Sequence, residues 1–120
     1  MKVNVNTRAP VYIQVMRYFK EKIATGELEP GEEIPSRRQL AQQMKINPNT
    51  VQRAYKEMEE QDLIYTEGNL PSRITKDETV LKAVREELVL EAVHTFISSV
   101  RSINVPLDEA LSLVKKNYEK

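Results

Sequence analysis

The sequence predicts a mostly α-helical chain with one small β-hairpin. Apolar residues recur at three- and four-residue steps over most of the 120 residues, which is the spacing of helices with one buried face. Residues that favour the start of a helix precede several of these stretches. One short β-favouring run near the middle is followed by turn residues and a returning run, which is typical of a hairpin.

The first predicted helix covers about residues 10–25. Pro10 suits its first turn, because the N–H that proline lacks would have no partner there. Gly26 favours an end just beyond the helix, because glycine readily adopts the left-handed conformation that closes many helices. The apolar face of this helix consists of Tyr12, Met16, Phe19 and Ile23. The segment GELEPGEEIP that follows carries a Pro-Gly pair and is predicted to be a loop.

Two further helices follow, joined by a tight turn. Ser36 and Gln39 form a capping-box pattern that opens a short helix over about residues 36–44. Asn47 and Pro48 are good N-cap and first-turn residues for a helix over about residues 48–61. The residues predicted to face inward are Leu40, Ala41, Met44, Val51, Ala54, Tyr55 and Met58. Two short helices joined by such a turn indicate a helix-turn-helix.

A small hairpin, called the wing, is predicted next. Residues 63–66 (Leu-Ile-Tyr-Thr) favour a strand, and residues 72–75 (Ser-Arg-Ile-Thr) can return as its partner. Gly68 and Asn69 can turn the chain between them. Pro71 weakens the second strand, because proline has no N–H to donate to a neighbouring strand. The hairpin would complete an N-terminal winged helix-turn-helix domain over residues 1–76.

Residues 77–120 are predicted to form a two-helix C-terminal dimerisation segment. Asn104 and Pro106 separate a long helix over about residues 78–102 from a second helix near Leu107. The apolar residues predicted to form the dimer contact are Val89, Val93, Phe96, Val100, Leu107, Leu111 and Val114. Two helices cannot bury such stripes alone, so pairing with a second copy is the favoured interpretation. The alternative is that both helices fold back onto the N-terminal domain.

Charge is balanced overall but unevenly placed. The chain has 18 basic and 18 acidic residues, and a net charge of zero by itself argues weakly against nucleic-acid binding. Between Ile34 and Lys56, however, there are five basic residues and no acidic one, and glutamates flank this segment on both sides. Charge alone leaves a phosphate-facing patch and a solvated face equally open.

The second helix of the helix-turn-helix carries residue types that recognise DNA. In this motif, the N-terminal residues of that helix meet base edges in the major groove. Asn and Gln can bind adenine, and Arg can bind guanine, through paired hydrogen bonds. The predicted DNA-contacting residues are Asn47, Asn49, Thr50, Gln52 and Arg53, with Arg37, Arg38 and Lys45 as phosphate ligands. The alternatives are structural: Asn47 as a cap, Arg53 as a solvated side chain, and the two neighbouring arginines as an ordinary exposed pair.

The composition argues against catalysis, metal binding and membrane insertion. The chain has no cysteine and a single histidine, His94, so neither a thiolate metal site nor a nucleophile–base pair is indicated. Its three glycines form no phosphate-binding loop. The apolar runs are far shorter than a membrane span, and the N-terminus lacks the pattern of a secretory signal. We therefore expect a cytoplasmic protein that is not an enzyme and has no cofactor.

Residues 9–75 resemble the GntR family of bacterial transcription regulators, in particular its short YtrA-like branch. The resemblance depends on APVYIQVMRYFKEKIATGELEPGEEIPSRRQLAQQMKINPNTVQRAYKEMEEQDLIYTEG, of which GELEPGEEIPSRRQLA and INPNTVQRAYKEME are the most specific parts. It implies a winged helix-turn-helix, operator binding as a dimer, and a C-terminal part that sets dimerisation and effector response. It also implies DNA contacts by Arg38, by the start of the recognition helix and by the wing. Many relatives have a Gly-x-Gly run in the wing, where this chain has GNLPSRIT and keeps Gly68 alone.

The expected function is therefore sequence-specific regulation of transcription, and more specifically repression. A homodimer would bind an inverted-repeat operator in double-stranded DNA through the helix over residues 48–61. The alternative is a winged-helix module that binds protein rather than DNA, which the acidic flanks and zero net charge favour slightly. The sequence leaves open whether a small-molecule effector binds, for instance near the hinge between Thr75 and Val80.

Overall fold

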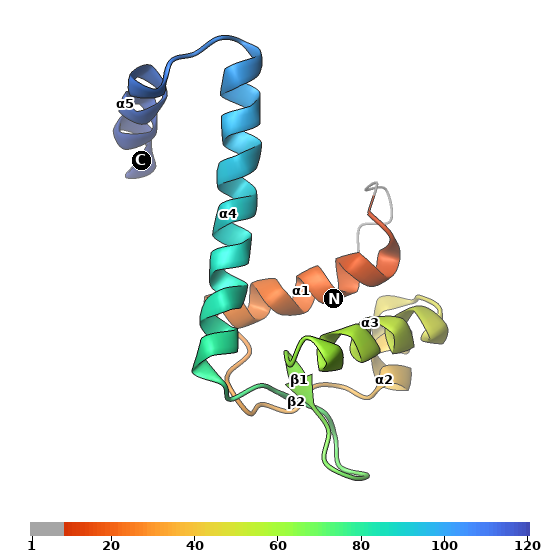
Figure 1. Ribbon diagram of the computed structural model, residues 1–120. Coiled ribbons are helices and arrows are strands. Elements are labelled where there is room, and N and C mark those ends of the chain that lie inside the picture. The colour runs from red at the N-terminus through yellow and green to blue at the C-terminus, as the bar shows by residue number, and fades with distance from the viewer. Residues whose placement is uncertain (1–8) are drawn as a thin grey trace. The chain divides into compact units, whose positions relative to one another are not determined.

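The computed structural model describes residues 9–120, which form five helices and one small antiparallel sheet (Figure 1). In chain order the elements are α1 (Val11–Thr25), α2 (Arg37–Met44), α3 (Pro48–Glu60), β1 (Ile64–Tyr65), β2 (Arg73–Ile74), α4 (Glu78–Ser102) and α5 (Leu107–Tyr118). The chain divides into two compact units within α4. The winged unit ends at Arg85, and the helical unit spans Glu86–Lys120.

The helix ends lie close to the positions that the sequence predicts. Gly26 closes α1 with a φ of 81°, the left-handed conformation that favours glycine. Ser36 caps α2 through a complete capping box, in which it and Gln39 exchange side-chain-to-backbone hydrogen bonds. The Asn47 side chain accepts a hydrogen bond from the backbone N–H of Asn49 at 2.8 Å, and Pro48 occupies the first turn of α3. These local signals account for the three N-terminal helices.

The core of the winged unit is built around α3, which contacts α1, α2 and β1. All the residues predicted to face inward from α2 and α3 are buried. Phe19 of α1 and Tyr55 of α3 meet edge to face, with ring centroids 5.9 Å apart. Because α3 packs through one face along its length, its opposite face remains exposed.

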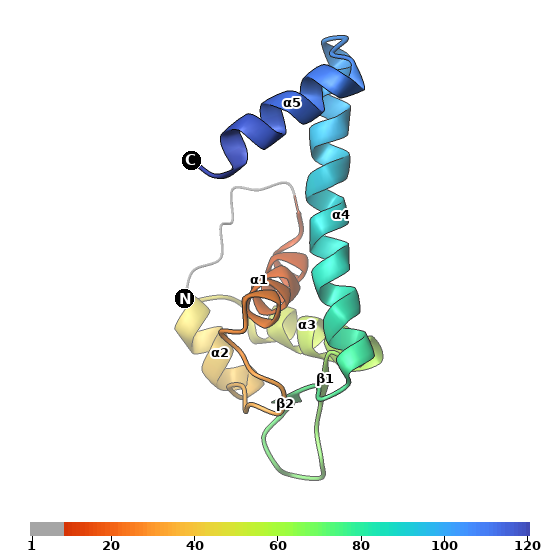
Figure 2. The same ribbon diagram turned by 90° about the vertical axis from the view of Figure 1, so that its left-hand side faces the viewer.

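The wing is a two-stranded antiparallel hairpin, which Figure 2 shows extending beyond the three helices. Ile64 pairs with Ile74, and Tyr65 pairs with Arg73. The strands are shorter than predicted, because regular pairing stops before Ser72 on the Pro71 side. On the other side of β2, the loop before α2 adds a single bridge between Glu33 and Arg73.

The division between the two units falls later than the predicted boundary at residue 76. The first turns of α4 carry Val80, Leu81 and Val84, which pack against the core of the winged unit. At 100° per residue, Val80, Leu81 and Val84 lie on a different side of α4 from Val89, Val93 and Phe96, so the apolar face changes close to this boundary.

The helical unit consists of the part of α4 after Arg85 and the whole of α5. A turn at Asn104, which has a φ of 59°, joins the two helices. Ala110 is buried, whereas the large apolar side chains of this unit are mostly exposed. The most exposed are Ile103, Leu107 and Tyr118, at 70%, 73% and 80%. Within residues 9–120, no helix is long and apolar enough to cross a membrane.

Candidate nucleic-acid interface

The turn between α2 and α3 fixes the start of α3 at the surface. Lys45 ends α2 in the left-handed conformation, with a φ of 56°, and its N–H bonds the carbonyl of Ala41. The N–H of Ile46 donates to the same carbonyl at 3.0 Å. Met44 and Val51 are buried on either side of the turn, so both helices are held by the core. The first turn of α3 is therefore rigidly presented rather than carried on a loose loop.

The exposed face of α3 carries most of the predicted DNA-contacting residues. Asn49, Gln52 and Arg53 are exposed, and Thr50 is half-buried. Asn47 is also exposed, and its side-chain oxygen is engaged in capping α3. Its side-chain N–H₂ group makes no hydrogen bond with any described residue, so capping leaves this donor group available.

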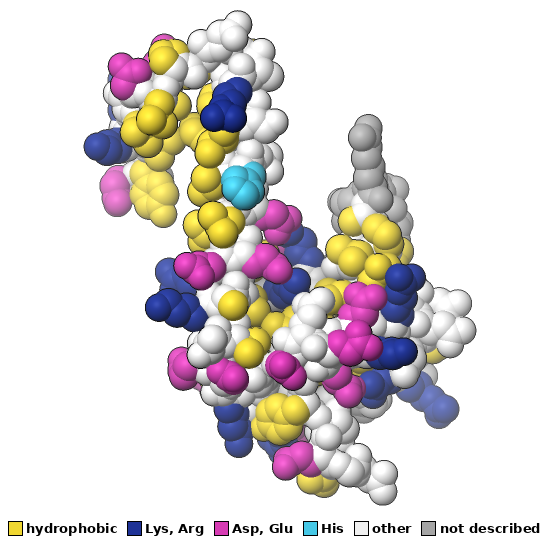
Figure 3. All heavy atoms as spheres, viewed as in Figure 1, with side chains coloured by type: hydrophobic (Ala, Val, Ile, Leu, Met, Phe, Trp, Pro, Cys, Tyr) yellow, Lys and Arg dark blue, Asp and Glu magenta, His cyan; other side chains and the backbone are white. Residues whose placement is uncertain are grey.

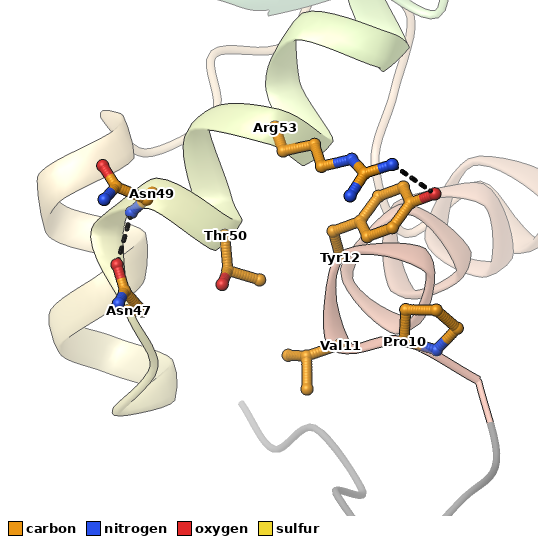
Figure 4. A pocket seen from close by; sticks show the side chains of 7 residues that line it. All are labelled: Pro10, Val11, Tyr12, Asn47, Asn49, Thr50 and Arg53. Atoms are coloured by element: carbon orange, nitrogen blue, oxygen red, sulfur yellow. Dashed lines mark hydrogen bonds between the residues drawn. The ribbon is translucent and has the colours of Figure 1, made fainter.

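A shallow pocket of about 370 Å³ adjoins this face, between the starts of α1 and α3 (Figure 4). Its lining residues are Pro10, Val11, Tyr12, Asn47, Asn49, Thr50 and Arg53. The pocket brings the first turn of α1 into the predicted interface. The sequence pattern predicts Tyr12 on the apolar face of its helix and indicates no role for it beside the recognition residues.

Tyr12 and Arg53 make two contacts across this pocket. The Arg53 guanidinium carbon lies 3.8 Å from the centroid of the Tyr12 ring, which is a close cation–π distance. The Nη2 group of Arg53 also donates a hydrogen bond to the Tyr12 hydroxyl at 3.1 Å. Glu57, one turn further along α3, has a carboxylate oxygen 3.6 Å from Nε of Arg53. The guanidinium is thus located by residues from two helices.

The adjacent arginines that open α2 have different surroundings. Arg37 is half-buried, donates to the Glu59 carboxylate of α3 at 2.7 Å, and has its guanidinium carbon 5.1 Å from the Tyr55 ring centroid. Arg38 is exposed and makes no hydrogen bond or ion pair with any described residue. Lys45, the third predicted phosphate ligand, is exposed as well. Arg37 would have to leave its ion pair to bind a phosphate, whereas Arg38 and Lys45 would not.

Tyr55 connects this arginine to the core. Its hydroxyl donates to the carbonyl of Pro35 at 2.6 Å, which ties α3 to the residue just before the cap of α2. Burial raises the pKa of the Tyr55 hydroxyl well above its ordinary value, and the Arg37 charge opposes that shift. The hydroxyl is therefore protonated at neutral pH and donates to the Pro35 carbonyl.

The tip of the wing is a turn of Glu67, Gly68, Asn69 and Leu70, in which the N–H of Leu70 donates to the carbonyl of Glu67 at 3.0 Å. Gly68 has a φ of 57°, and a Cβ added there would meet no atom within 4 Å. Leu70 beside it is 60% exposed. Arg73, the basic residue of β2, is engaged elsewhere: it donates to the carbonyl of Gly31 and to the Glu33 carboxylate, each at 2.8 Å.

The predicted dimerisation residues lie in the helical unit, where α4 and α5 border an apolar hollow of about 660 Å³. Six of them line it: Val93, Phe96, Val100, Leu107, Leu111 and Val114. Val89 is 53% exposed and lies outside the lining. Figure 3 shows hydrophobic side chains gathered on the facing sides of these two helices. The hollow therefore collects most of the predicted stripe on one apolar surface.

His94 is exposed on α4. No group of side chains in the part of the chain that the structure describes could hold a metal ion.

Three packed helices with an exposed third helix, followed by a β-hairpin, form the architecture of winged helix-turn-helix DNA-binding domains. The sequence model of the family described as bacterial regulatory proteins, gntR family, matches residues 11–74. The chain belongs to the GntR family. It is 28% identical over 117 residues to the HTH-type transcriptional repressor YtrA of Bacillus subtilis, covering 97% of this chain and 90% of YtrA. The predicted YtrA-like GntR resemblance is confirmed, and the family consists of transcription regulators rather than enzymes.

Two solved structures have a similar fold, one of them over nearly the whole chain. A GntR family transcriptional regulator from Listeria monocytogenes is 31% identical with a TM-score of 0.85, covering 92% of this chain and 97% of that chain. The DNA-binding domain of AraR, in complex with operator ORX1, has a TM-score of 0.56 at 22% identity and covers 62% of this chain and 95% of that one. The predicted fold class, a winged helix-turn-helix followed by helices, is confirmed.

Proposed function

We propose that this protein is a transcriptional repressor that binds an inverted-repeat operator as a homodimer, in the cytoplasm, with α3 in the major groove. The observation that carries the proposal is the first half of α3, where capped and core-anchored backbone presents Asn49, Gln52 and Arg53 to solvent. These side chains match the hydrogen-bonding groups of adenine and guanine. Rigid presentation matters because base readout requires donors and acceptors at fixed spacing.

Phosphate contacts would fix the position of α3 on the duplex. Arg38 lies in the first turn of α2 and Lys45 just after its end, and both have exposed, uncommitted charges, so we assign them this role. Arg37 would instead join α2 to α3 through Glu59. Gly68 at the wing tip leaves room for close approach to the DNA backbone. The repressor name of YtrA and the operator complex of AraR support the same assignment by similarity.

A second copy of the chain would cover the apolar surface of the helical unit. Phe96, Leu111 and Val114 line a hollow too apolar to be a stable exposed surface in water. Helices of a second copy offer the matching apolar side chains, since both copies carry the same stripe. A two-fold dimer also matches an inverted repeat, whose half-sites lie about one helical turn apart.

The test is selection of bound fragments from random duplex DNA by the purified protein at physiological salt, followed by sequencing. Enrichment of an inverted repeat with half-sites about one helical turn apart would support the proposal. If the folded protein enriches no sequence, the proposal fails and a protein-binding role becomes the better explanation. Affinity for the enriched fragment should also fall steeply as salt rises, because phosphate binding releases counterions.

Arg53→Ala separates base readout from general attraction to DNA. We expect it to weaken binding to the enriched fragment by about 1–3 kcal/mol, and binding to random DNA far less. The matched control is Arg17→Ala, which removes another exposed arginine with a glutamate four residues further along its helix. Equal losses on both DNAs would rule out base readout by Arg53.

A further inference from the structure

The contact between Tyr12 and Arg53 joins residues that are 41 positions apart in the chain and lie on different helices. Figure 4 shows the guanidinium lying over the aromatic ring, with one amino group directed at the hydroxyl. A side chain that is 61% exposed would ordinarily sample many rotamers. Here the ring face, the hydroxyl and the nearby Glu57 restrict it from three directions.

The chemistry of the tyrosine suits a residue that must still bind another group. A phenol holds a guanidinium through its ring face and its oxygen without neutralising the positive charge. Glu59 pairs with Arg37 through a hydrogen bond of 2.7 Å, whereas the ion pair between Glu57 and Arg53 is longer, at 3.6 Å, and has no hydrogen bond. The Nη1 group of Arg53 donates to none of the described residues, so one edge of the guanidinium remains available. The two arginines are therefore held in different ways: Arg37 by a hydrogen-bonded ion pair, and Arg53 by the tyrosine together with a longer ion pair.

We propose that Tyr12 is a positioning residue for DNA recognition: it orders the Arg53 guanidinium before DNA binds and so sets the base preference at the position that Arg53 contacts. Ordering a flexible side chain at an interface lowers affinity, and a side chain ordered in advance avoids part of that loss. The proposal rests on the proposed function, because it requires Arg53 to face a base. It adds a residue of α1 to a recognition surface otherwise formed by α2, α3 and the wing.

The test is a double-mutant cycle on the two positions, measured on the fragment enriched by the wild type and on random duplex of the same length. Tyr12→Leu should weaken binding to the enriched fragment by roughly 3- to 10-fold, the range expected for ordering one flexible side chain. In the Arg53→Ala background the same change should have little further effect. Tyr12→Phe keeps the ring and removes the hydrogen bond, so its loss should be intermediate.

Two readouts separate positioning from a general structural role. Selection with Tyr12→Leu should relax the base preference at the same position as selection with Arg53→Ala, and the other positions should keep theirs. The matched control is Tyr18→Leu, since Tyr18 is also a partly buried tyrosine of α1 with a cation, Lys22, 5.5 Å from its ring centroid. This control should lose thermal stability to a similar degree or more and should leave the base preference unchanged.

Each outcome decides the proposal. The proposal is supported if Tyr12→Leu relaxes the base preference at the position that Arg53→Ala also relaxes, and if the double-mutant cycle shows that the effects of the two substitutions are coupled. Equal losses from Tyr12→Leu in both backgrounds, or no loss at all, overturn it and leave Arg53 as an independent contact. If the wild type enriches no sequence, the proposed function itself fails, and the positioning role fails with it.

Discussion

Arg37 and Arg38 are adjacent and chemically identical, yet the structure predicts opposite consequences when each is replaced by alanine. Arg37 bonds Glu59 and lies against the Tyr55 ring, so its removal should destabilise the winged unit. Arg38 is exposed and contacts no described partner, so its removal should leave stability within about 0.5 kcal/mol of the wild type. Each variant is the matched control for the other.

The magnitude for Arg37→Ala follows from its contacts. The side chains of Arg37 and Glu59 are 35% and 37% exposed, and an ion pair so accessible contributes about 0.5 kcal/mol. The cation–π contact with Tyr55 adds about 0.5–1 kcal/mol. Nε of Arg37 is buried without a hydrogen-bond partner, and removing it regains part of a desolvation cost. The expected net loss is about 1 kcal/mol, or about 4–8 °C in Tm for a unit of this size.

Thermal melts and a salt titration of DNA affinity measure the two effects separately. Arg37→Ala should lower Tm and keep the dependence of log Kd on log salt concentration. Arg38→Ala should keep Tm and reduce that slope by about one unit, because the proposed phosphate contact would be lost. Identical behaviour of the two variants would contradict these assignments, as would an Arg38→Ala protein with a changed Tm and an unchanged salt slope.

Three further changes probe other parts of the structure. Phe96→Glu places a charge in the apolar hollow and should shift the protein to a monomer in sedimentation experiments. The control Ser98→Glu, at an exposed position outside the hollow, should leave the dimer intact. A dimeric Phe96→Glu protein would exclude this surface as the dimer contact. Tyr55→Phe removes the bond to the Pro35 carbonyl and should reduce the free energy of unfolding by about 1 kcal/mol in denaturant titrations, and an unchanged midpoint would show that water replaces it. Ser36→Ala removes half of the capping box of α2 and should reduce the free energy of unfolding by about 1 kcal/mol in the same titrations. An unchanged free energy would show that the Ser36 side chain does not stabilise α2.

The helix boundaries could be predicted closely because they depend on residues next to one another in the chain. Each helix end depends on a residue that acts within one turn, so a short stretch of sequence is enough to predict it. These residues are Gly26, Ser36 and Pro48. The hydrophobic steps of α2 and α3 predicted their buried faces for the same reason. The strands are shorter than predicted. The extent of their pairing depends on the partner strand across the wing and on Pro71, which has no N–H to donate to it.

The partners of the charged and aromatic side chains could not be predicted, because they depend on how distant helices pack. Arg37 and Glu59 are 22 positions apart; Arg37 lies in a segment without acidic residues, and Glu59 is one of several neighbouring glutamates, so the sequence does not single out this pair. Nothing in the pattern around Tyr12 distinguishes a core residue from one that also contacts Arg53.

At Lys45, the backbone conformation that favours stability and the side-chain charge that favours DNA binding call for different residues. Its left-handed backbone at the end of α2 costs about 1 kcal/mol for a residue with a Cβ atom, and glycine would avoid this cost. Lys45→Gly should therefore raise the melting temperature while removing a positive charge from the turn beside α3. Stability and DNA affinity would then change in opposite directions, so a screen for heat resistance would favour variants that have lost part of their affinity for DNA.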